Sequence, residues 1–391
     1  MINKVIWFNK SKGLFFRKAR VGIVGDILYL YLDDVNQLER IYTKYGLEPE
    51  SILVVEVHFL GDRNCLFRYI LKELDILLKK EGDFRIVSSY SSNHGCFIRS
   101  KSQIQNEFSL STDGRYQLTT SYNSHSVLSL TYKKLKNTLK VVDAIDKWSF
   151  GIITNGKKQE QVENLVRSIQ NLNIPNYEVL ICGTFLITSE HMESVVVIDD
   201  VITDDLRAPI SVKKNKIASL AKFENLILLH DRYVFPLDWY ENMLVYGNYY
   251  ELLIIKNIGP SGGRVNDWSS FYGMPSQIKG LSRLLPYSSW NEEWFSQGGI
   301  VVIKRSIYNR LSIDERLFWG ELEDVQFSKK AQLEGYFCYL DINNSIFTYS
   351  DRILESRLYE KIWTLKFKQF VRGFLVYSKN LSTYYKNFFR Q

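Results

Sequence analysis

Residues 149–156 read SFGIITNG, and with QEQVENLVRSIQNL at 159–172 and YEVLICG at 177–183 they decide the fold class. The first and third segments are short apolar runs that end in small or polar residues, which is typical of buried strands. The middle segment places Val162 and Leu165, with the apolar residues that follow them, on one face of a helix. This strand–helix–strand order predicts an α/β fold with parallel strands.

The length and composition indicate a globular protein of more than one domain. A chain of 391 residues, 45% of them hydrophobic, has the material for two cores. Aromatic residues make up 14% of the chain, and such rings suit sugar stacking and membrane interfaces as well as cores. Composition alone therefore leaves the use of the aromatic residues open.

Three blocks follow one another along the chain. We expect a smaller α/β domain over 1–140, a second α/β domain over 148–350 and a basic amphipathic helical tail over 351–391. In the first block, LFRYILKELDILLKKEG at 66–82 predicts a helix that leads into a strand at 83–91.

The cysteines and the apolar runs indicate a cytoplasmic protein. The 4 cysteines lie far apart and form no CxxC pair, which argues against a zinc site or a disulfide framework. The N-terminus has no signal-peptide pattern, and no run of about eighteen apolar residues is present. The sequence therefore predicts no membrane-spanning helix.

The tail carries much of the net charge of +7. Its apolar residues from Phe370 to Phe388, spaced by three and four, predict a helix with one apolar face. Such a helix docks on its own protein or lies on an anionic membrane, where each basic residue adds about 1 kcal/mol. The second use would attach the protein peripherally to the inner face of the plasma membrane. No nucleic-acid-binding motif is visible, so we expect no nucleic-acid partner.

The first block contains ILVVEVHFLGDRNCLFRYILKELDILLKKEGDFRIVSS at 52–89 and NEFSLSTDGRYQLTTSYNSHSVLSLTYKK at 106–134. Together these segments look like the second half of a class I methyltransferase-like domain. The glycine-rich loop that holds the cofactor in those enzymes is missing, and GIVGD at 22–26 does not replace it. The resemblance therefore implies a domain without a cofactor, with a bifunctional methyltransferase as the alternative.

The second block carries several spaced motifs in a fixed order. After the opening strand come LILLHDRYVFPLDWYENML at 226–244, QGGIVVIKRSIY at 297–308 and WGELEDVQFSKKAQLEGYFCYLD at 319–341. In this order they resemble the family-2-type glycosyltransferases with the GT-A fold, especially those that build bacterial surface polysaccharides such as capsule or O-antigen. The resemblance implies an inverting, hexosyltransferase-like enzyme that moves a sugar from a nucleotide sugar to a glycan or lipid-linked glycan.

The resemblance assigns the catalytic base to the acidic pair at the start of the last motif. Asp324 would be the base, with Glu323 beside it. Trp319, Gly320 and Glu321 would form the adjoining sugar-binding corner on the acceptor side. The alternative is an ordinary acidic first turn, because carboxylates near a helix N-terminus are favoured by the helix dipole.

On the donor side, family members present a carboxylate cluster that binds Mg²⁺ or Mn²⁺ against the diphosphate. This chain offers His230, Asp231 and Arg232, which retain one carboxylate. Asp231 would bind the metal, or Arg232 would itself neutralise the diphosphate. A third interpretation is that His230 and Arg232 only cap the strand.

Further donor and acceptor residues follow from the same resemblance. Asp199 or Asp200 would replace the nucleotide-binding carboxylate that the family has after its second strand. For Lys213 a solvated basic face is as good an explanation as a donor contact, so this lysine is not assigned to the donor set. The donor set is completed by Thr154, Asn155, Gly156, Lys214 and Asn215, and the acceptor set by Asp267, Trp268, Gly298 and Gly299.

These observations predict a cytoplasmic, membrane-associated bacterial glycosyltransferase. Because only one carboxylate remains at 230–232, a catalytically silent adaptor in a polysaccharide assembly complex is the alternative from a different functional class. The donor sugar, the nucleotide, the acceptor and the linkage are not encoded in any motif, since one such fold serves many of them.

Overall fold

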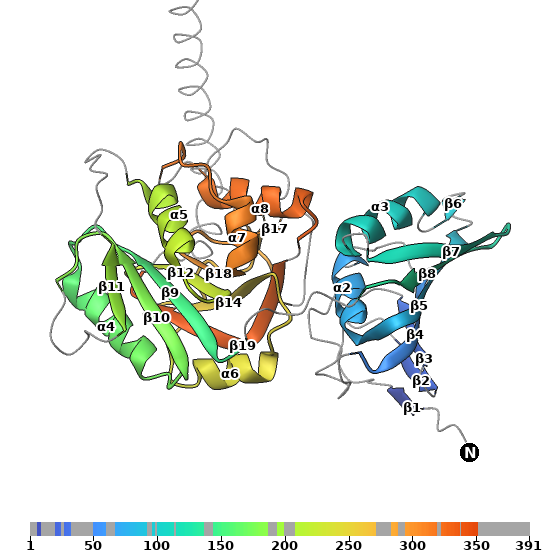
Figure 1. Cartoon of the computed structure of the whole chain (residues 1–391), viewed down its shortest axis with the longest axis horizontal. Coiled ribbons are helices and arrows are strands. Elements are labelled where there is room, and N and C mark those ends of the chain that lie inside the picture. The colour runs from blue at the N-terminus through green and yellow to red at the C-terminus, as the bar shows by residue number, and fades with distance from the viewer. Residues whose placement is uncertain are drawn as a thin grey trace, which may run out of the picture.

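In the part of the chain that it describes, the computed structural model contains two eight-stranded sheets and a small three-stranded sheet, with helices packed against them (Figure 1). The protein is therefore a mixed α/β protein, as the sequence predicted. The structure describes residues 6–8, 20–24, 27–32, 50–59, 67–91, 96–97, 100–112, 115–136, 144–186, 194–198, 208–270, 283–287, 294–318, 322–336 and 338–350.

The elements of the N-terminal sheet are β1 (Ile6–Phe8), β2 (Arg20–Val24), β3 (Ile27–Leu32), β4 (Ile52–Phe59), β5 (Leu78–Ser91), β6 (Cys96–Phe97), β7 (Tyr116–Asn123) and β8 (Val127–Lys134), with helices α2 (Phe67–Leu77) and α3 (Lys101–Thr112). The order is β1-β2-β3-β4-β5-β8-β7, and β6 pairs with β5. Among the described strands of this sheet, only β3, β4 and β5 pair in parallel. The likeness of this unit to a methyltransferase domain stays a prediction.

Helix α2 is shorter than the sequence predicted. It ends at Leu77, and β5 begins at Leu78, so Lys79–Gly82 belong to the strand and not to the helix. Lys134 explains this end, because its Nζ donates to the carbonyl oxygens of Asp75 at 2.6 Å and Leu78 at 2.7 Å. The pairing of β4 with β5 then shifts register across this segment, which the helical periodicity of 66–82 could not indicate.

The elements of the C-terminal sheet are β9 (Lys147–Ile153), β10 (Asn176–Cys182), β11 (Val195–Ile198), β12 (Asn225–His230), β13 (Tyr233–Val234), β14 (Leu252–Ile258), β18 (Ile300–Lys304) and β19 (Cys338–Thr348). Their order is β11-β10-β9-β12-β18-β14-β19-β13. The three-stranded sheet consists of β15 (Ser269–Ser270), β16 (Arg283–Leu284) and β17 (Trp294–Phe295). The strands predicted at 149–156 and 177–183 correspond to β9 and β10.

Most strands of the C-terminal sheet end at the same edge. β11, β10, β9 and β12 are parallel, β18 runs against β12 and β14, and β14 is parallel to β19. The carboxyl ends of β9, β10, β12, β14 and β19 therefore lie along one edge, which we call the carboxyl edge. The chain leaves β9 towards β10 and returns to β12 on its other side. Ligands bind at such a switch point in open α/β sheets.

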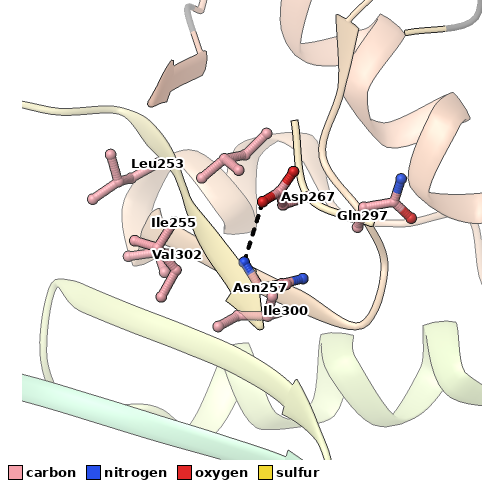
Figure 2. A pocket seen from close by; sticks show the side chains of 8 residues that line it. Leu253, Ile255, Asn257, Asp267, Gln297, Ile300 and Val302 are labelled. Atoms are coloured by element: carbon pink, nitrogen blue, oxygen red, sulfur yellow. Dashed lines mark hydrogen bonds between the residues drawn. The ribbon is translucent and has the colours of Figure 1, made fainter. Parts of the chain in front are cut away.

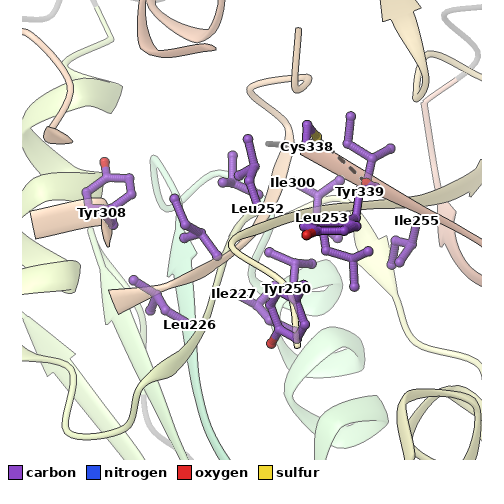
Figure 3. Packing of buried hydrophobic residues seen from close by; sticks show 14 of the residues in the cluster. Leu226, Ile227, Tyr250, Leu252, Leu253, Ile255, Ile300, Tyr308, Cys338 and Tyr339 are labelled. Atoms are coloured by element: carbon purple, nitrogen blue, oxygen red, sulfur yellow. Dashed lines mark hydrogen bonds between the residues drawn. The ribbon is translucent and has the colours of Figure 1, made fainter. Parts of the chain in front are cut away.

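The strands are held by a continuous apolar core. Leu226, Ile227, Leu252 and Leu253 are at most 1% exposed, and Figure 3 shows how side chains from β12, β14, β18 and β19 meet there. Almost every residue of β12 and β18 is buried, so these strands read as apolar runs and not as alternating ones. A rigid sheet of this kind fixes the positions of the residues at its ends.

The helices of this unit are α4 (Gln159–Gln170), α5 (Ile210–Leu220), α6 (Trp239–Tyr246), α7 (Arg305–Leu311) and α8 (Glu323–Leu333). The apolar face predicted for α4 is confirmed, since Val162 and Leu165 are buried. Helix α5 packs closely on β9, where a Cβ at Gly151 would lie 2.3 Å from Ile217. This close packing brings α5 to the switch point between β9 and β12.

Some predicted residues lie outside the described part of the chain. They are Asp199, Asp200, Trp319, Gly320, Glu321 and the whole tail 351–391. Within the described part, no helix is both long and apolar enough to span a membrane.

Candidate active site

The switch point brings Thr154 and Asp231 together from two different strands. Thr154 follows β9 and Asp231 follows β12, and the hydroxyl of Thr154 donates to Asp231 Oδ2 at 2.9 Å. Thr154 Oγ1 also accepts the backbone N–H of Gly156 at 3.1 Å. The strand-end residues that the sequence singled out therefore form one hydrogen-bonded group.

Lys213 belongs to this group, although the sequence gave no reason to prefer it over a solvated lysine. Its side chain is buried, and Nζ donates to the Thr154 carbonyl oxygen at 2.9 Å. Lys213 lies four residues before Ile217 on the sheet-facing side of α5, and this spacing is the signal that could have found it. The expectation of a solvated basic face is wrong for Lys213.

Two glycines shape the loops beside Thr154. At Gly183, just after β10, a Cβ would lie 2.1 Å from the Thr154 carbonyl oxygen, and the backbone has a φ of +127°. At Gly156 the φ is +78°, and a Cβ would lie 2.8 Å from Thr184 Cβ. Both positions therefore require glycine, and the two loops approach each other more closely than side chains would allow.

Asn155, His230 and Arg232 surround this group. Asn155 is exposed, and its Oδ1 accepts the backbone N–H of Lys157 at 3.1 Å. His230 donates its backbone N–H to the Gly299 carbonyl oxygen at 3.0 Å. The guanidinium of Arg232 lies beside the ring of Tyr233, with 5.7 Å between Cζ and the ring centroid. A Cβ at Gly299 would lie 2.9 Å from Arg232 Nη2, so the guanidinium lies beside the Gly299 turn.

The glycine pair Gly298–Gly299 connects the end of β12 with the start of α8. The backbone N–H of Gly298 donates to Asp324 Oδ2 at 2.9 Å. A Cβ at Gly298 would lie 2.9 Å from Glu323 Oε1, and one at Gly299 would lie 2.4 Å from the Tyr233 hydroxyl oxygen. The sequence assigned the pair to the acceptor set; in the structure it joins the two candidate regions.

Glu323 and Asp324 occupy the first turn of α8, as the sequence predicted. The residue before them, Leu322, adopts a left-handed conformation with a φ of 65°, which is costly for a residue with a side chain. This turn directs Glu323 into the interior, where it is buried, and leaves Asp324 half-buried next to the Gly298 turn. Strain of this kind is concentrated at functional sites.

Lys214 lies on the other side of Gly298. Its side chain is fully buried, and Nζ donates to the Gly298 carbonyl oxygen at 2.6 Å. Burial lowers the pKa of Lys214, and the carboxylates of Glu323 and Asp324 oppose that shift. Lys214 was predicted to contact the donor, but the structure places it behind the glycine turn and beside the acidic pair.

The pKa of Asp324 is raised, because burial disfavours its charged form. The hydrogen bond from Gly298 and the positive charge of Lys214 both lower the pKa of Asp324, because they stabilise its carboxylate anion. A carboxylate with a raised pKa is a better proton acceptor than an ordinary surface aspartate. The geometry of Asp324 therefore suits a general base.

Asn215 takes no part in the group around Thr154. Its amide donates to Ile313 O at 2.8 Å and Glu315 Oε1 at 3.1 Å, and its oxygen accepts from Tyr308 and from the N–H of Ile313. These bonds tie α5 to the segment after α7. In this structure Asn215 has a structural role, in contrast to the donor contact that we predicted.

Asp267 and Trp268 are likewise engaged inside the protein. Asp267 is 1% exposed and accepts hydrogen bonds from Arg264, Tyr287 and two backbone N–H groups, and Trp268 is fully buried. Figure 2 shows Asp267 bonded to Asn257 at a cavity of about 10 Å³, which is no larger than one water needs. The predicted contact of Trp268 with a sugar has no exposed ring surface in this geometry.

Among the residues that the structure describes, Asp231 is the predicted donor carboxylate at the switch point. Among the described residues, no group of three or more potential ligands that would hold a metal is present. Mg²⁺ typically binds through one or two carboxylates and takes its other ligands from substrate phosphates and water. Asp231 fits that role, because Thr154 donates to Oδ2 and no described residue bonds Oδ1.

No protein-family model matches the chain, and no curated protein matches it significantly. Among solved structures the chain is similar to fragment 1–349 of TarS from S. aureus, a glycosyltransferase, with 15% identity, 52% of this chain and 60% of that chain covered, and a TM-score of 0.37. The same fragment in complex with UDP-GlcNAc gives 12% identity, coverage of 52% and 58%, and a TM-score of 0.36. At these values the likeness carries no conclusion on function.

Proposed function

We propose that the chain is a glycosyltransferase that moves a sugar from a nucleotide sugar to a glycan acceptor. The observation that carries this proposal is the Gly298–Gly299 turn, which joins a polar group at the switch point to a carboxylate with a raised pKa. A phosphate-binding region and a base held side by side are what sugar transfer from a diphosphate donor requires.

The donor would bind at the switch point. Its base and ribose would lie along Thr154, Asn155 and Gly156, where the loops after β9 and β10 approach each other. Its diphosphate would lie near Asp231 and Arg232, which neutralise charge as a metal ligand and as a cation. Lys213 supports this region from behind, because it holds the carbonyl group of Thr154.

The acceptor would approach Asp324. An oxygen of the acceptor hydroxyl attacks the anomeric carbon of the donor sugar while its proton passes to Asp324. The bond between the anomeric carbon and the phosphate oxygen breaks, and the nucleoside diphosphate leaves with that electron pair. Because attack and departure occur on opposite faces in one displacement, the configuration is inverted. Mg²⁺ or Mn²⁺ held by Asp231 would stabilise the leaving diphosphate.

The proposal extends to the acceptor and to the place of the reaction. Resemblance to enzymes of bacterial surface polysaccharide synthesis suggests a lipid-linked acceptor such as a capsule or O-antigen precursor. An inverting hexosyltransferase on the inner face of the plasma membrane, held there by the basic tail, would meet such an acceptor.

Donor binding tests the proposal without knowledge of the acceptor. We would titrate the intact protein with a panel of nucleotide sugars by calorimetry, with Mg²⁺ present. One donor should bind, and Asp231→Asn should bind it about tenfold more weakly, the equivalent of one charge-assisted contact. Asp238→Asn is the matched control, because Asp238 is exposed next to α6. If no donor binds, or if Asp231→Asn binds as the wild type does, the silent adaptor becomes the better account.

A further inference from the structure

A second pocket opens on the carboxyl edge, away from Thr154. It has a volume of about 310 Å³, and its walls come from three places in the chain. Phe347, Thr348 and Tyr349 lie at the end of β19, Val234 lies in β13, and the turn 259–262 follows β14. This size falls at the lower end of the range for small-ligand pockets.

Two of the residues that line the pocket are exposed aromatic side chains. Phe347 is 45% exposed and Tyr349 is 46% exposed, whereas the neighbouring Tyr233 is buried. Exposed rings leave apolar surface in contact with water. A ligand that covers them removes this surface from water, which makes binding more favourable. The C–H face of a sugar ring is such a ligand, and the tyrosine hydroxyl can bond a sugar hydroxyl in addition.

The opposite wall is a tight turn. Gly262 donates its N–H to the Gly259 carbonyl oxygen at 3.0 Å, and Gly259 donates to the Gly263 carbonyl oxygen at 2.8 Å. Gly262 has a φ of +74°, and a Cβ there would meet no atom within 4 Å. The glycine therefore serves the backbone of the turn and leaves the mouth of the pocket open.

The pocket is joined to the candidate active site by the backbone. Tyr349 donates its N–H to the Arg232 carbonyl oxygen at 2.9 Å, and Thr348 pairs with Tyr233 in the β13–β19 ladder. Arg232 is the residue after Asp231. A molecule seated on Phe347 and Tyr349 would therefore reach along the same edge towards the reacting groups.

The lining is uncharged. None of the seven lining residues that the structure describes carries a charge, so a phosphate or a nucleotide would find no counter-ion among them. The pocket is also too small to take a helix of another protein. A neutral ring with one apolar face is the ligand that these walls fit best.

We propose that this pocket binds one sugar ring of the acceptor glycan, stacked on Phe347 and Tyr349. The inference rests on the proposed transferase function and adds a place where the acceptor is held. It assigns the two aromatic residues to binding and not to catalysis, and it leaves Asp324 as the group that takes the proton.

Glycan binding by the intact protein tests this assignment. We would titrate the full chain with chitotetraose, cellotetraose, maltotetraose and mannotetraose and follow ligand signals by saturation-transfer NMR. At least one of these should bind, and the double variant Phe347→Ala/Tyr349→Ala should bind it about tenfold more weakly. Leu244→Ala is the matched control, because Leu244 is 48% exposed on α6 and does not line the pocket.

A melting curve for each variant excludes unfolding as the cause of a loss. If no tetrasaccharide binds the wild type at millimolar concentration, or if the double variant binds as well as the wild type, the inference is overturned. A parallel titration with nucleotide sugars separates the two proposals. If the wild type binds a donor but no glycan, the proposed transferase function is supported and the glycan pocket is overturned. If the wild type binds a glycan that the double variant does not bind, and binds no donor, the glycan pocket is supported and the transferase function is overturned.

Discussion

Lys214 and Asp324 are held on opposite sides of one glycine. Lys214 Nζ donates to the carbonyl oxygen of Gly298 at 2.6 Å, and the N–H of Gly298 donates to Asp324 Oδ2 at 2.9 Å. The buried ammonium also lies within electrostatic reach of both Glu323 and Asp324. The position and the charge of the candidate base therefore depend on a residue in another helix, more than 100 positions earlier in the chain.

Removal of this ammonium should make the base harder to ionise. Lys214 lowers the pKa of Asp324, so Lys214→Met should raise it further, and the acid limb of the pH–rate profile should move to higher pH. Below neutral pH we expect turnover about tenfold or more slower than in the wild type. Lys216→Met, at an exposed position of α5, is the control that should leave the profile in place. An unshifted acid limb in Lys214→Met would show that Lys214 does not influence the pKa of the base.

The glycine turn should not tolerate a methyl group. In Gly298→Ala the new Cβ would lie 2.9 Å from Glu323 Oε1 and 3.2 Å from Asp324 Cβ, so the acidic pair has to move. Displacement of a catalytic group by about 1 Å costs about 100-fold in rate, and we expect a loss of kcat of that order. Gly263→Ala is the comparison, since its Cβ would meet only the Ser261 hydroxyl, at 3.4 Å. Equal kcat values for these two variants would argue against the proposed geometry.

The metal is predicted to act through Asp231. Removal of divalent ions with EDTA should weaken donor binding by about tenfold or more, because the diphosphate loses its main counter-ion, and Mn²⁺ or Mg²⁺ should restore it. Asp231→Asn should respond less to EDTA than the wild type does. If EDTA leaves wild-type binding unchanged while Arg232→Gln abolishes it, the arginine and not a metal neutralises the diphosphate.

The N-terminal unit should depend on a buried ion cluster. Asp75 binds Arg115 at 2.7 Å, Lys134 at 3.2 Å and the Tyr116 hydroxyl at 2.6 Å. Loss of one partner from a buried ion pair costs about 3 kcal/mol or more, so Asp75→Ala should lower the free energy of unfolding by that amount in urea. Asp83→Ala is a control on β5, where Asp83 is partly exposed. Equal stability of Asp75→Ala and the wild type would contradict this expectation.

The same cluster predicts a dependence of stability on pH. Burial raises the pKa of Asp75, but Arg115 and Lys134 outweigh it and the net pKa is lowered. The stabilisation is therefore fully present above the unfolded pKa of about 3.9 and is lost as the pH falls through the lower folded value. The difference in unfolding free energy between wild type and Asp75→Ala should therefore decrease as the pH falls below the unfolded pKa. A difference that grows as the pH falls would contradict the sign.

The C-terminal sheet was readable from the sequence because its strands are apolar runs with clear ends. The strands at 149–156 and 177–183 and the apolar face of α4 are confirmed, since each depends on local periodicity. The end of α2 was not readable, because Lys134 fixes it from a distant strand. Periodicity describes one segment at a time and carries no information on such a contact.

The candidate site was readable only in part, and for a related reason. Asp324, Asp231 and Thr154 lie at ends of elements, where polar residues after apolar runs are visible. Lys213 and Lys214 have the same charge as the exposed Lys216, and only packing on β9 and the glycine turn distinguishes them. Trp268 shows the converse, because an aromatic residue beside an acid looks like a sugar site in sequence and is buried in the structure.

Nucleotide release is the measurement that tests the central claim most directly. Each nucleotide sugar of a panel would be incubated with the intact protein, both alone and with an extract of lipid-linked glycans. The released nucleotide would then be measured. We predict that one donor is turned over, and that Asp324→Asn still binds this donor but releases nucleotide about 100-fold more slowly. Asp238→Asn should match the wild type. Release by Asp324→Asn at the wild-type rate, or no release from any donor by the wild type under either condition, would contradict a glycosyltransferase with Asp324 as its base.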